Sequence, residues 1–277
     1  MIVDDLKSIS AATITYFSDL AMIEELLKSV QTAASELFNV HRAGLNYFIV
    51  DNSDDETYFN RLDSRVSGVF NTDSLCVHIF RAKKNLGFGG GNNLILGQLH
   101  SRYHVIINPD VTLKRWSLSN AFEYLERNDG VAMITPRIDE SKYARHVAKM
   151  YPDCFTLALR YIDLPFLNYA FKKRLKKYNC ENIVADNVVE VEQVGGCFFF
   201  IRTALFKALD GFDDKYFMYF EDFDLSIRVR RLGSIVYHPD VVITHEGGGV
   251  GRKNIKHHIY FIRSAIRFYC CYGWKLF

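Results

Sequence analysis

Two adjacent carboxylates follow a run of large apolar side chains. Glu221 and Asp222 come directly after residues 216–220, which are Tyr, Phe, Met, Tyr and Phe. A carboxylate that such neighbours shield from water has a raised pKa and can act as a general base. On one helix, adjacent side chains differ in direction by about 100°, so the two acids cannot serve the same contact. We expect Asp222 to be the base.

The same stretch has a structural alternative. Acidic residues are favoured in the first turn of a helix by the helix dipole. Asp224 and Arg228 also have the i, i+4 spacing of an ordinary ion pair on a helix. We therefore expect a structural role for Asp224.

A divalent cation could bind where two strands end. Asp110 closes an Asn-Pro-Asp turn after an apolar strand, and Mg²⁺ sites often use one or two carboxylates plus substrate phosphates. His245 follows another strand and precedes three glycines, so its imidazole could supply a second ligand. The alternatives are a plain turn for Asp110 and a packed or solvated side chain for His245.

A glycine-rich loop, residues 85–93, lies between a strand and a helix. It fails the dinucleotide-binding pattern, because Asn92 stands where the third glycine belongs. A backbone without side chains can approach a ligand closely, and the cations Arg81, Lys83 and Lys84 precede it. A flexible turn is the alternative.

These residues need a framework that brings strand ends together. Apolar strands are predicted at Ile9–Tyr16, Leu45–Val50, Leu75–Phe80 and Tyr103–Ile107, and each ends in a polar or glycine-rich loop. A helix is predicted over Leu20–Phe38 with Ser18 as its cap. Alternating strands and helices indicate an α/β protein with an open sheet, whose ligands bind at the carboxyl edge.

The second half of the chain shows weaker patterns. No repeat or linker interrupts it, so we expect one composite domain. Its predicted elements are strands at Val131–Thr135, Val188–Val191, Cys197–Ile201, Ile235–Tyr237 and Val241–Thr244, and a helix from Glu221 to Leu232 that stops at Gly233.

Charge is distributed unevenly over the 277 residues. The formal net charge is only +2 at pH 7, which argues against a nucleic-acid binder. Residues 141–180 nevertheless hold nine Lys or Arg against two acids, and residues 252–277 hold six and no acid. The remainder is therefore acidic, and we expect two kinds of surface.

Cysteine usage and the ends of the chain indicate a compartment. The six cysteines form no C-x-x-C pair, so neither a zinc site nor a disulfide framework is predicted. No secretory signal or membrane-spanning run is apparent. We expect a cytoplasmic protein that touches a membrane, if at all, from the inner face.

Taken together, the motifs resemble those of a known family. They occur in this order: Thr15-Tyr16, 49–53 (Ile-Val-Asp-Asn-Ser), 85–93, 108–111 (Asn-Pro-Asp-Val), 195–197 (Gly-Gly-Cys), 211–213 (Gly-Phe-Asp), 217–225 and His245. The succession resembles the family 2 glycosyltransferases of the GT-A fold, a Rossmann-like open mixed sheet. It is most similar to bacterial rhamnosyltransferase-type enzymes of O-antigen and surface-polysaccharide synthesis.

The resemblance implies inverting transfer from a nucleoside-diphosphate sugar, with dTDP-rhamnose ahead of UDP-sugars, to a glycan or lipid-linked glycan acceptor. Asp222 would be the catalytic base, and Asp110 with His245 would bind Mg²⁺ or Mn²⁺. Gly195, Gly196 and Glu221 would contact the acceptor. The implied donor-binding residues are Thr15, Tyr16, Asp51, Lys84, Asn85, Gly87, Phe88, Gly89, Asn93, Asn108 and Asp110.

The resemblance also implies a division of the chain. Residues 1–251 would form the glycosyltransferase domain, with a nucleotide-sugar half (1–135) and an acceptor and catalytic half (136–251). The aromatic and basic segment 252–277 suits either a headgroup boundary or a core-packing helix.

Two residues depart from the family's pattern, and the first of them keeps another function open. Asn108 replaces the first acid of the family's D-x-D motif, and Phe17 replaces an Asn after Thr-Tyr. An inactive nucleotide- or glycan-binding module of the same fold is therefore the main alternative. A nucleotidyltransferase is a third, although its N-terminal glycine-rich loop is missing.

Overall fold

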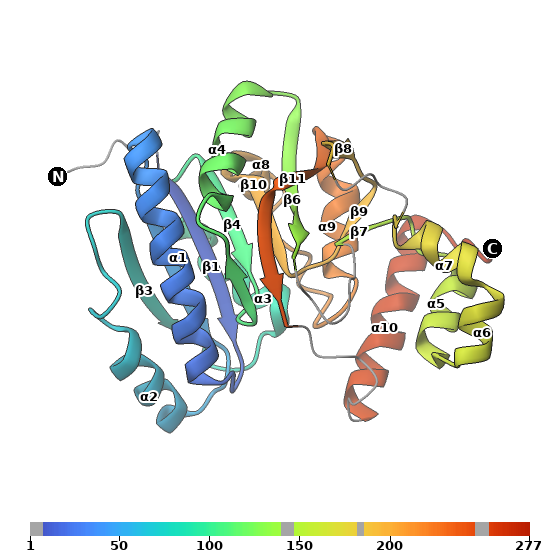
Figure 1. The fold of residues 1–277 in the computed structure, drawn as a ribbon. Coiled ribbons are helices and arrows are strands. Elements are labelled where there is room, and N and C mark those ends of the chain that lie inside the picture. The colour runs from blue at the N-terminus through green and yellow to red at the C-terminus, as the bar shows by residue number, and fades with distance from the viewer. Residues whose placement is uncertain (1–7, 140–146, 182–185, 247–254) are drawn as a thin grey trace.

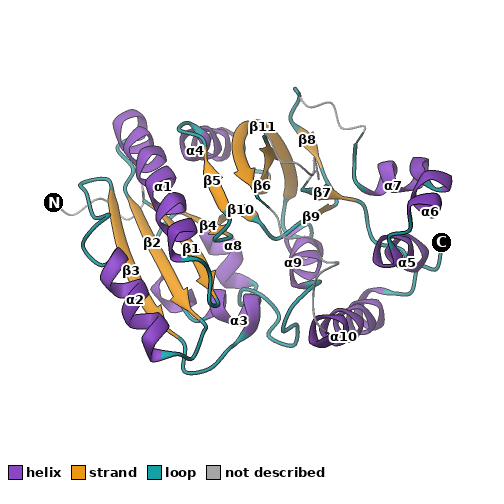
Figure 2. Ribbon diagram, turned by 60° about the horizontal axis from the view of Figure 1, so that its bottom comes forward, coloured by secondary structure: helices purple, strands orange, loops and turns teal. Residues whose placement is uncertain are grey.

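A mixed sheet forms the centre of the molecule (Figure 1). The computed structural model describes residues 8–139, 147–181, 186–246 and 255–277. The nine-stranded sheet has the order β3 (Leu75–Arg81), β2 (Leu45–Asp51), β1 (Ile9–Thr15), β4 (Tyr103–Ile107), β10 (Phe198–Arg202), β6 (Val131–Ile138), β11 (Ser234–His245) and β5 (Val111–Leu113), with β8 (Val189–Glu190) beside β11. Helices flank it on both faces (Figure 2), which confirms the predicted α/β class.

Strands β3, β2, β1 and β4 run parallel, as their continuous apolar sequences predict. Thr15 pairs with Asp51, and Asp51 pairs with Arg81, so three strands end at one level. The polar loops that follow therefore share one edge of the sheet.

Helices α1 (Leu20–His41) and α4 (Ser117–Arg127) pack against each other over this sheet. The predicted cap of α1 is wrong by one residue. Asp19, and not Ser18, accepts a hydrogen bond from the backbone N–H of Ala21 at 3.0 Å. Asp and Ser are comparable caps, so composition alone could not separate them.

Strand β10 joins the two halves of the chain because it runs antiparallel between β4 and β6. Its first residue, Phe198, pairs with Ile107 at the end of β4. The backbone N–H of Asn108 donates to the carbonyl oxygen of Cys197 at 2.9 Å. The Gly-Gly-Cys stretch thus lies beside the Asn-Pro-Asp turn.

Strand β11 is a single element where the sequence predicts two short strands. Its pairing with β6 shifts between His238 and Val242. Pro239 lies in this interval and has no N–H to donate, so the ladder is interrupted while the strand continues. The strand ends at His245, opposite Val111 of β5.

The remaining elements complete this framework. Helix α9 (Glu221–Val229) is three residues shorter than predicted. The others are α2 (Glu56–Val66), α3 (Gly87–Asn93), the short turn η2 (Leu96–Gln98), α8 (Thr203–Ala208) and a small sheet of β7 (Ala148–Lys149) and β9 (Gln193–Val194).

The two basic segments of the sequence meet at one end of the molecule. Helices α5 (Cys154–Ile162), α6 (Pro165–Ala170), α7 (Lys172–Tyr178) and α10 (Ile255–Tyr272) lie together in both views, away from β3. The ring of Tyr161 stacks on Phe261, and its hydroxyl hydrogen-bonds His258 Nδ1 at 2.5 Å. In the described part of the chain, no helix is long and apolar enough to cross a membrane.

Candidate active site

A strained turn leads into helix α9. Tyr219 and Phe220 have φ angles of 72° and 66°, a left-handed conformation that non-glycine residues rarely adopt. Such residues cost of order 1–3 kcal/mol each and persist only where their surroundings hold them. Helix α10 does so: Phe268 packs 5.3 Å from the Phe220 ring, and Ser264 Oγ donates to the carbonyl oxygen of Met218 at 2.9 Å.

The turn aims Asp222 at the Gly-Gly-Cys stretch. One carboxylate oxygen accepts the backbone N–H of Gly196 at 3.0 Å, and the other accepts the N–H of Phe223 at 2.9 Å. Burial raises the pKa of Asp222, although these backbone hydrogen bonds act in the opposite direction. The carboxylate is fixed in position and more basic than an ordinary aspartate.

Glu221 points elsewhere, as the angle between adjacent helical side chains requires. It is 7% exposed and lies against Gly89 of α3. Its Oε2 has no hydrogen-bond partner among the described residues. Burial, followed by the charge of Asp222, raises the pKa of Glu221.

Asp224 has the structural role expected for it. It accepts from Arg228 at 2.7 Å and from the Tyr272 hydroxyl at 2.6 Å. Arg228 also donates to the carbonyl oxygens of Leu209 and Gly211. This network joins α9 to α10 and to the turn after α8. Asp224 is therefore engaged in structural contacts, and Asp222 is the acid that faces Gly196.

Asp110 and His245 lie together at the ends of β5 and β11. His245 Nε2 is 3.2 Å from Asp110 Oδ2, and both side chains are about one-fifth exposed. Two ligands at right angles on a Mg²⁺ ion, each about 2.1 Å from it, would be about 3 Å apart. A carboxylate and an imidazole therefore fit one divalent cation. The described residues contain no group of three or more His, Cys, Asp or Glu suited to a metal.

The glycine-rich loop packs against its own chain. Gly87 has a φ of 74°, and a Cβ there would lie 2.0 Å from the carbonyl oxygen of Phe217. A Cβ on Gly89 would lie 2.8 Å from the Phe212 side chain, and one on Gly91 would lie 2.8 Å from Ile14. Glycine is required at these positions because the 211–217 segment approaches Gly87 and Gly89 closely and Ile14 of β1 approaches Gly91.

The asparagines of this loop also make internal bonds. Asn85 accepts the N–H of Gly87 at 2.9 Å. Asn93 donates to the carbonyl oxygen of Phe212 at 2.8 Å and accepts its N–H at 2.9 Å. Asn93 therefore holds the 211–212 turn on α3, while Lys84 is exposed at the start of the loop.

The residues at the ends of β1 and β2 differ in their exposure to solvent. Thr15 and Asp51 are fully buried. Both carboxylate oxygens of Asp51 accept from Ser53, at 2.9 Å from its N–H and 3.0 Å from its hydroxyl. Tyr16 and Phe17 are more than half exposed and touch edge to face. The aromatic pair is therefore the accessible surface at this edge.

Cys197 connects the two acidic centres. Burial raises the pKa of its thiol to about 12, and the charges of Asp110 and Asp222 act in the same direction. Its neighbour Gly196 donates to Asp222, and its own carbonyl oxygen accepts the N–H of Asn108, so this stretch links the two motifs. The residue chemistry of the sequence assigns no role to Cys197. The feature that points to this position is the pair of glycines before it, at the start of a strand.

A comparison with protein families decides where this arrangement belongs. The model described as glycosyltransferase-like family 2 matches residues 46–259. The chain belongs to this family. This match confirms the resemblance to family 2 glycosyltransferases that the order of the motifs indicated.

Two curated relatives of this family 2 chain are rhamnosyltransferases. It is 28% identical over 156 residues to rhamnosyltransferase WbbL of Escherichia coli K12, covering 53% of the chain and 55% of the relative. It is 25% identical over 197 residues to N-acetylglucosaminyl-diphospho-decaprenol L-rhamnosyltransferase of Mycobacterium tuberculosis, covering 65% and 62%. The chain thus spans only part of the length of these relatives.

Solved structures show the fold of this family 2 chain. The GalNAc-T7 complex with UDP, GalNAc and Mn²⁺ has a TM-score of 0.66 at 14% identity, over 95% of this chain and 48% of that one. S. aureus TarS 1-349 has a TM-score of 0.53 at 15% identity, over 86% and 60%. The neighbours are GT-A glycosyltransferases, so the predicted GT-A fold is confirmed.

Glu221→Gln tests the electrostatic state of the buried acid. Because the folded-state pKa is raised, the stabilisation from protonated Glu221 is complete below the ordinary glutamate pKa of about 4.3 and is lost as pH rises through the folded value. We expect the variant to gain thermal stability over the native protein at pH 8 and to gain less at pH 5, by circular dichroism melts. The exposed Glu25→Gln is the control. An equal difference at both pH values would contradict the assignment.

Proposed function

We propose that the chain is an inverting glycosyltransferase that moves a sugar from a nucleoside-diphosphate donor, dTDP-rhamnose before UDP-sugars, to a glycan or lipid-linked glycan of a surface polysaccharide. The observation that carries this proposal is the partly desolvated Asp222 carboxylate, which is oriented by Gly196, next in sequence to the Cys197 carbonyl that binds the Asn-Pro-Asp turn. Family membership supports it.

Asp222 acts on the acceptor as the general base. Its carboxylate takes the proton of an acceptor hydroxyl as that oxygen attacks the anomeric carbon of the donor sugar. The bond from the anomeric carbon to the diphosphate breaks on the opposite face, so the configuration inverts and no covalent enzyme intermediate is needed. Gly195, Gly196 and Glu221 shape the acceptor side.

The donor binds at the carboxyl edge of the sheet. Tyr16 offers an exposed ring for the nucleotide base, Lys84 offers charge for the phosphates, and Asp110 with His245 would hold Mg²⁺ or Mn²⁺. The cation, when bound, supplies positive charge that stabilises the leaving diphosphate. We propose that Asn85, Phe88, Asn93 and Asn108 lie along the donor at this edge, and that the buried Thr15, Asp51, Gly87 and Gly89 shape the backbone behind them.

The activities of the two relatives support the choice of substrates. Both are rhamnosyltransferases, and the mycobacterial name specifies an acceptor with a diphosphate and a decaprenol chain. The UDP complexes among the solved structures support a nucleoside-diphosphate donor in general.

Asp222→Asn separates an enzyme from a binding module. The amide keeps the size of the carboxylate but cannot take a proton, so transfer should fall by about 10²–10⁴-fold while donor binding persists. Transfer is measured with dTDP-rhamnose and a UDP-sugar panel, and binding by calorimetry. Asp210→Asn is the matched control, because Asp210 is exposed with a φ of 54°, which asparagine tolerates. Full activity in Asp222→Asn would refute the assignment, and an inactive native protein would favour the module.

We also propose that the end of the molecule formed by α5, α6 and α10 contacts a membrane. Ile255, Ile259, Ile262 and Ile266 share one face of α10 and are 49–76% exposed. On α5, on α6 and between them, Ile162, Leu164, Phe166 and Tyr169 are 42–83% exposed. Lys256 on α10 and Lys172 and Lys173 after α6 are exposed and close in sequence to these side chains, so we propose that this surface lies on anionic lipid headgroups.

Sedimentation with phosphatidylglycerol vesicles tests the lipid contact. Burying an isoleucine contributes about 1.5–3 kcal/mol, so Ile259→Ser with Ile266→Ser should reduce binding at least tenfold. Val40→Ser on α1 is the control, because Val40 is 52% exposed on another helix. Equal sedimentation of the double variant and the native protein would exclude this surface.

A further inference from the structure

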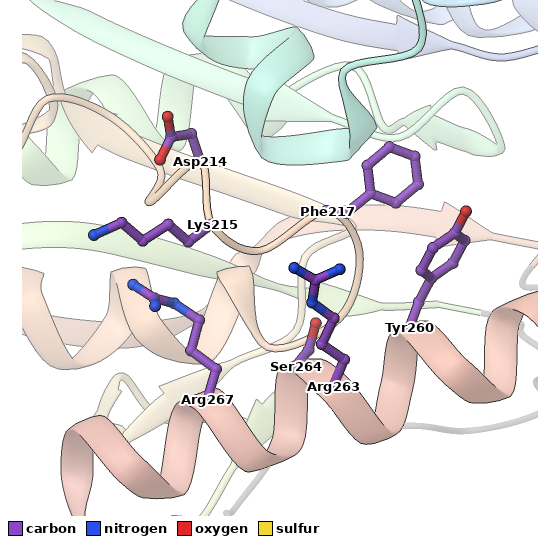
Figure 3. A pocket seen from close by; sticks show the side chains of 7 residues that line it. All are labelled: Asp214, Lys215, Phe217, Tyr260, Arg263, Ser264 and Arg267. Carbon is purple, nitrogen blue, oxygen red and sulfur yellow. The ribbon is translucent and has the colours of Figure 1, made fainter.

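A pocket of about 580 Å³ lies between α10 and the segment that precedes α9 (Figure 3). The side chains of Arg263 and Arg267 extend from α10 toward this segment. The lining residues are Asp214, Lys215, Phe217, Tyr260, Arg263, Ser264 and Arg267. None of them is among the proposed base, metal ligands, donor-binding or acceptor-binding residues, although Ser264 and Phe217 help to hold the turn and the glycine-rich loop.

The lining has a cationic part and an aromatic part. Lys215, Arg263 and Arg267 supply three positive charges, and Asp214 is the one acid among the lining residues. The rings of Phe217 and Tyr260 lie 4.7 Å apart at the other end of the pocket. The pocket therefore suits an anion that carries an apolar or ring-shaped neighbour.

The cations differ in how firmly they are held. Arg267 pairs with Asp213 at 2.5 Å and lies over the Tyr216 ring, and its Nε is buried without a partner among the described residues. Arg263 and Lys215 form no salt bridge within the described part of the chain. The three cations therefore outnumber the two neighbouring acids, Asp213 and Asp214. Arg267 is held by its ion pair, whereas Arg263 and Lys215 can pair with a ligand.

The pocket shares a wall with the proposed catalytic site. The carbonyl oxygen of Phe217 accepts the N–H of Phe88 at 3.3 Å. On the far side of Phe88, a Cβ on Gly196 would lie 3.8 Å from its ring and 3.6 Å from Asp222 Oδ2. Phe217 and Phe88 therefore link the pocket to the Gly196–Asp222 contact.

We propose that this pocket binds the phosphate or diphosphate group of a phosphorylated acceptor. Guanidinium groups match phosphate oxygens with paired N–H donors, and Lys215 adds a mobile charge. The Phe217–Tyr260 pair offers flat apolar surface to the group attached to the phosphate. The assignment to the acceptor rests on the proposed function, because the donor diphosphate then lies at Asp110 and His245, which do not line this pocket.

Calorimetric titrations with inorganic pyrophosphate, and separately with UDP and dTDP, test the assignment. A lost charged hydrogen bond weakens binding roughly tenfold or more, so Arg263→Gln and Lys215→Gln should each weaken pyrophosphate binding by that factor. Affinity for UDP and dTDP should not change. Arg231→Gln is the control, because Arg231 is an exposed arginine outside the pocket.

The possible results distinguish this anion site from the donor site. They also distinguish a failure of this inference from a failure of the proposed function. Unchanged pyrophosphate binding in both variants, an equal loss in Arg231→Gln, or a matching loss of nucleotide affinity would each overturn the inference. A protein with no sugar transfer whose pyrophosphate binding depends on Arg263 would refute the proposed function and uphold the anion site.

Discussion

The left-handed turn at Tyr219 and Phe220 is the constraint on which the candidate site depends. It reverses the chain just before α9 and sends Glu221 toward α3 and Asp222 toward Gly196. The aromatic rings of α10 and its Ser264 hydroxyl hold the turn, while Asp224 ties the following helix to Tyr272. The C-terminal helix therefore acts on the site through packing, without supplying a residue to the proposed chemistry.

The antiparallel strand β10 provides the second half of this arrangement. It starts at the carboxyl edge of the parallel strands, where Phe198 pairs with Ile107, so the Gly196–Cys197 stretch just before it reaches both Asp222 and the Asn108 turn. Asp110 lies at the edge of the sheet and Asp222 at the start of α9, and the basic helices lie at one end of the molecule. A near-neutral total charge thus conceals an acidic site next to cationic surfaces, which suits a phosphorylated or membrane-bound acceptor.

The sequence predicts features that depend on local pattern. Parallel strands with polar ends, the role of Asp224 and the meeting of Asp110 with His245 all follow from spacing and strand position. It does not reveal contacts between distant segments. The glycines of α3 are explained by Phe212, Phe217 and Ile14, and the pocket needs side chains from α10 and the 214–217 segment. Nor does the pattern show two consecutive left-handed residues that are not glycine, because tertiary packing imposes them.

Titration of the Asp222 carboxyl by ¹³C NMR, assigned with Asp222→Asn, tests the central claim most directly. The claim is that the clamped turn holds this carboxylate partly out of water, ready to take a proton. The account predicts a midpoint well above the ordinary aspartate pKa of about 3.9. A midpoint at or below that value would show that the backbone hydrogen bonds outweigh burial and would contradict the assignment of Asp222 as the base.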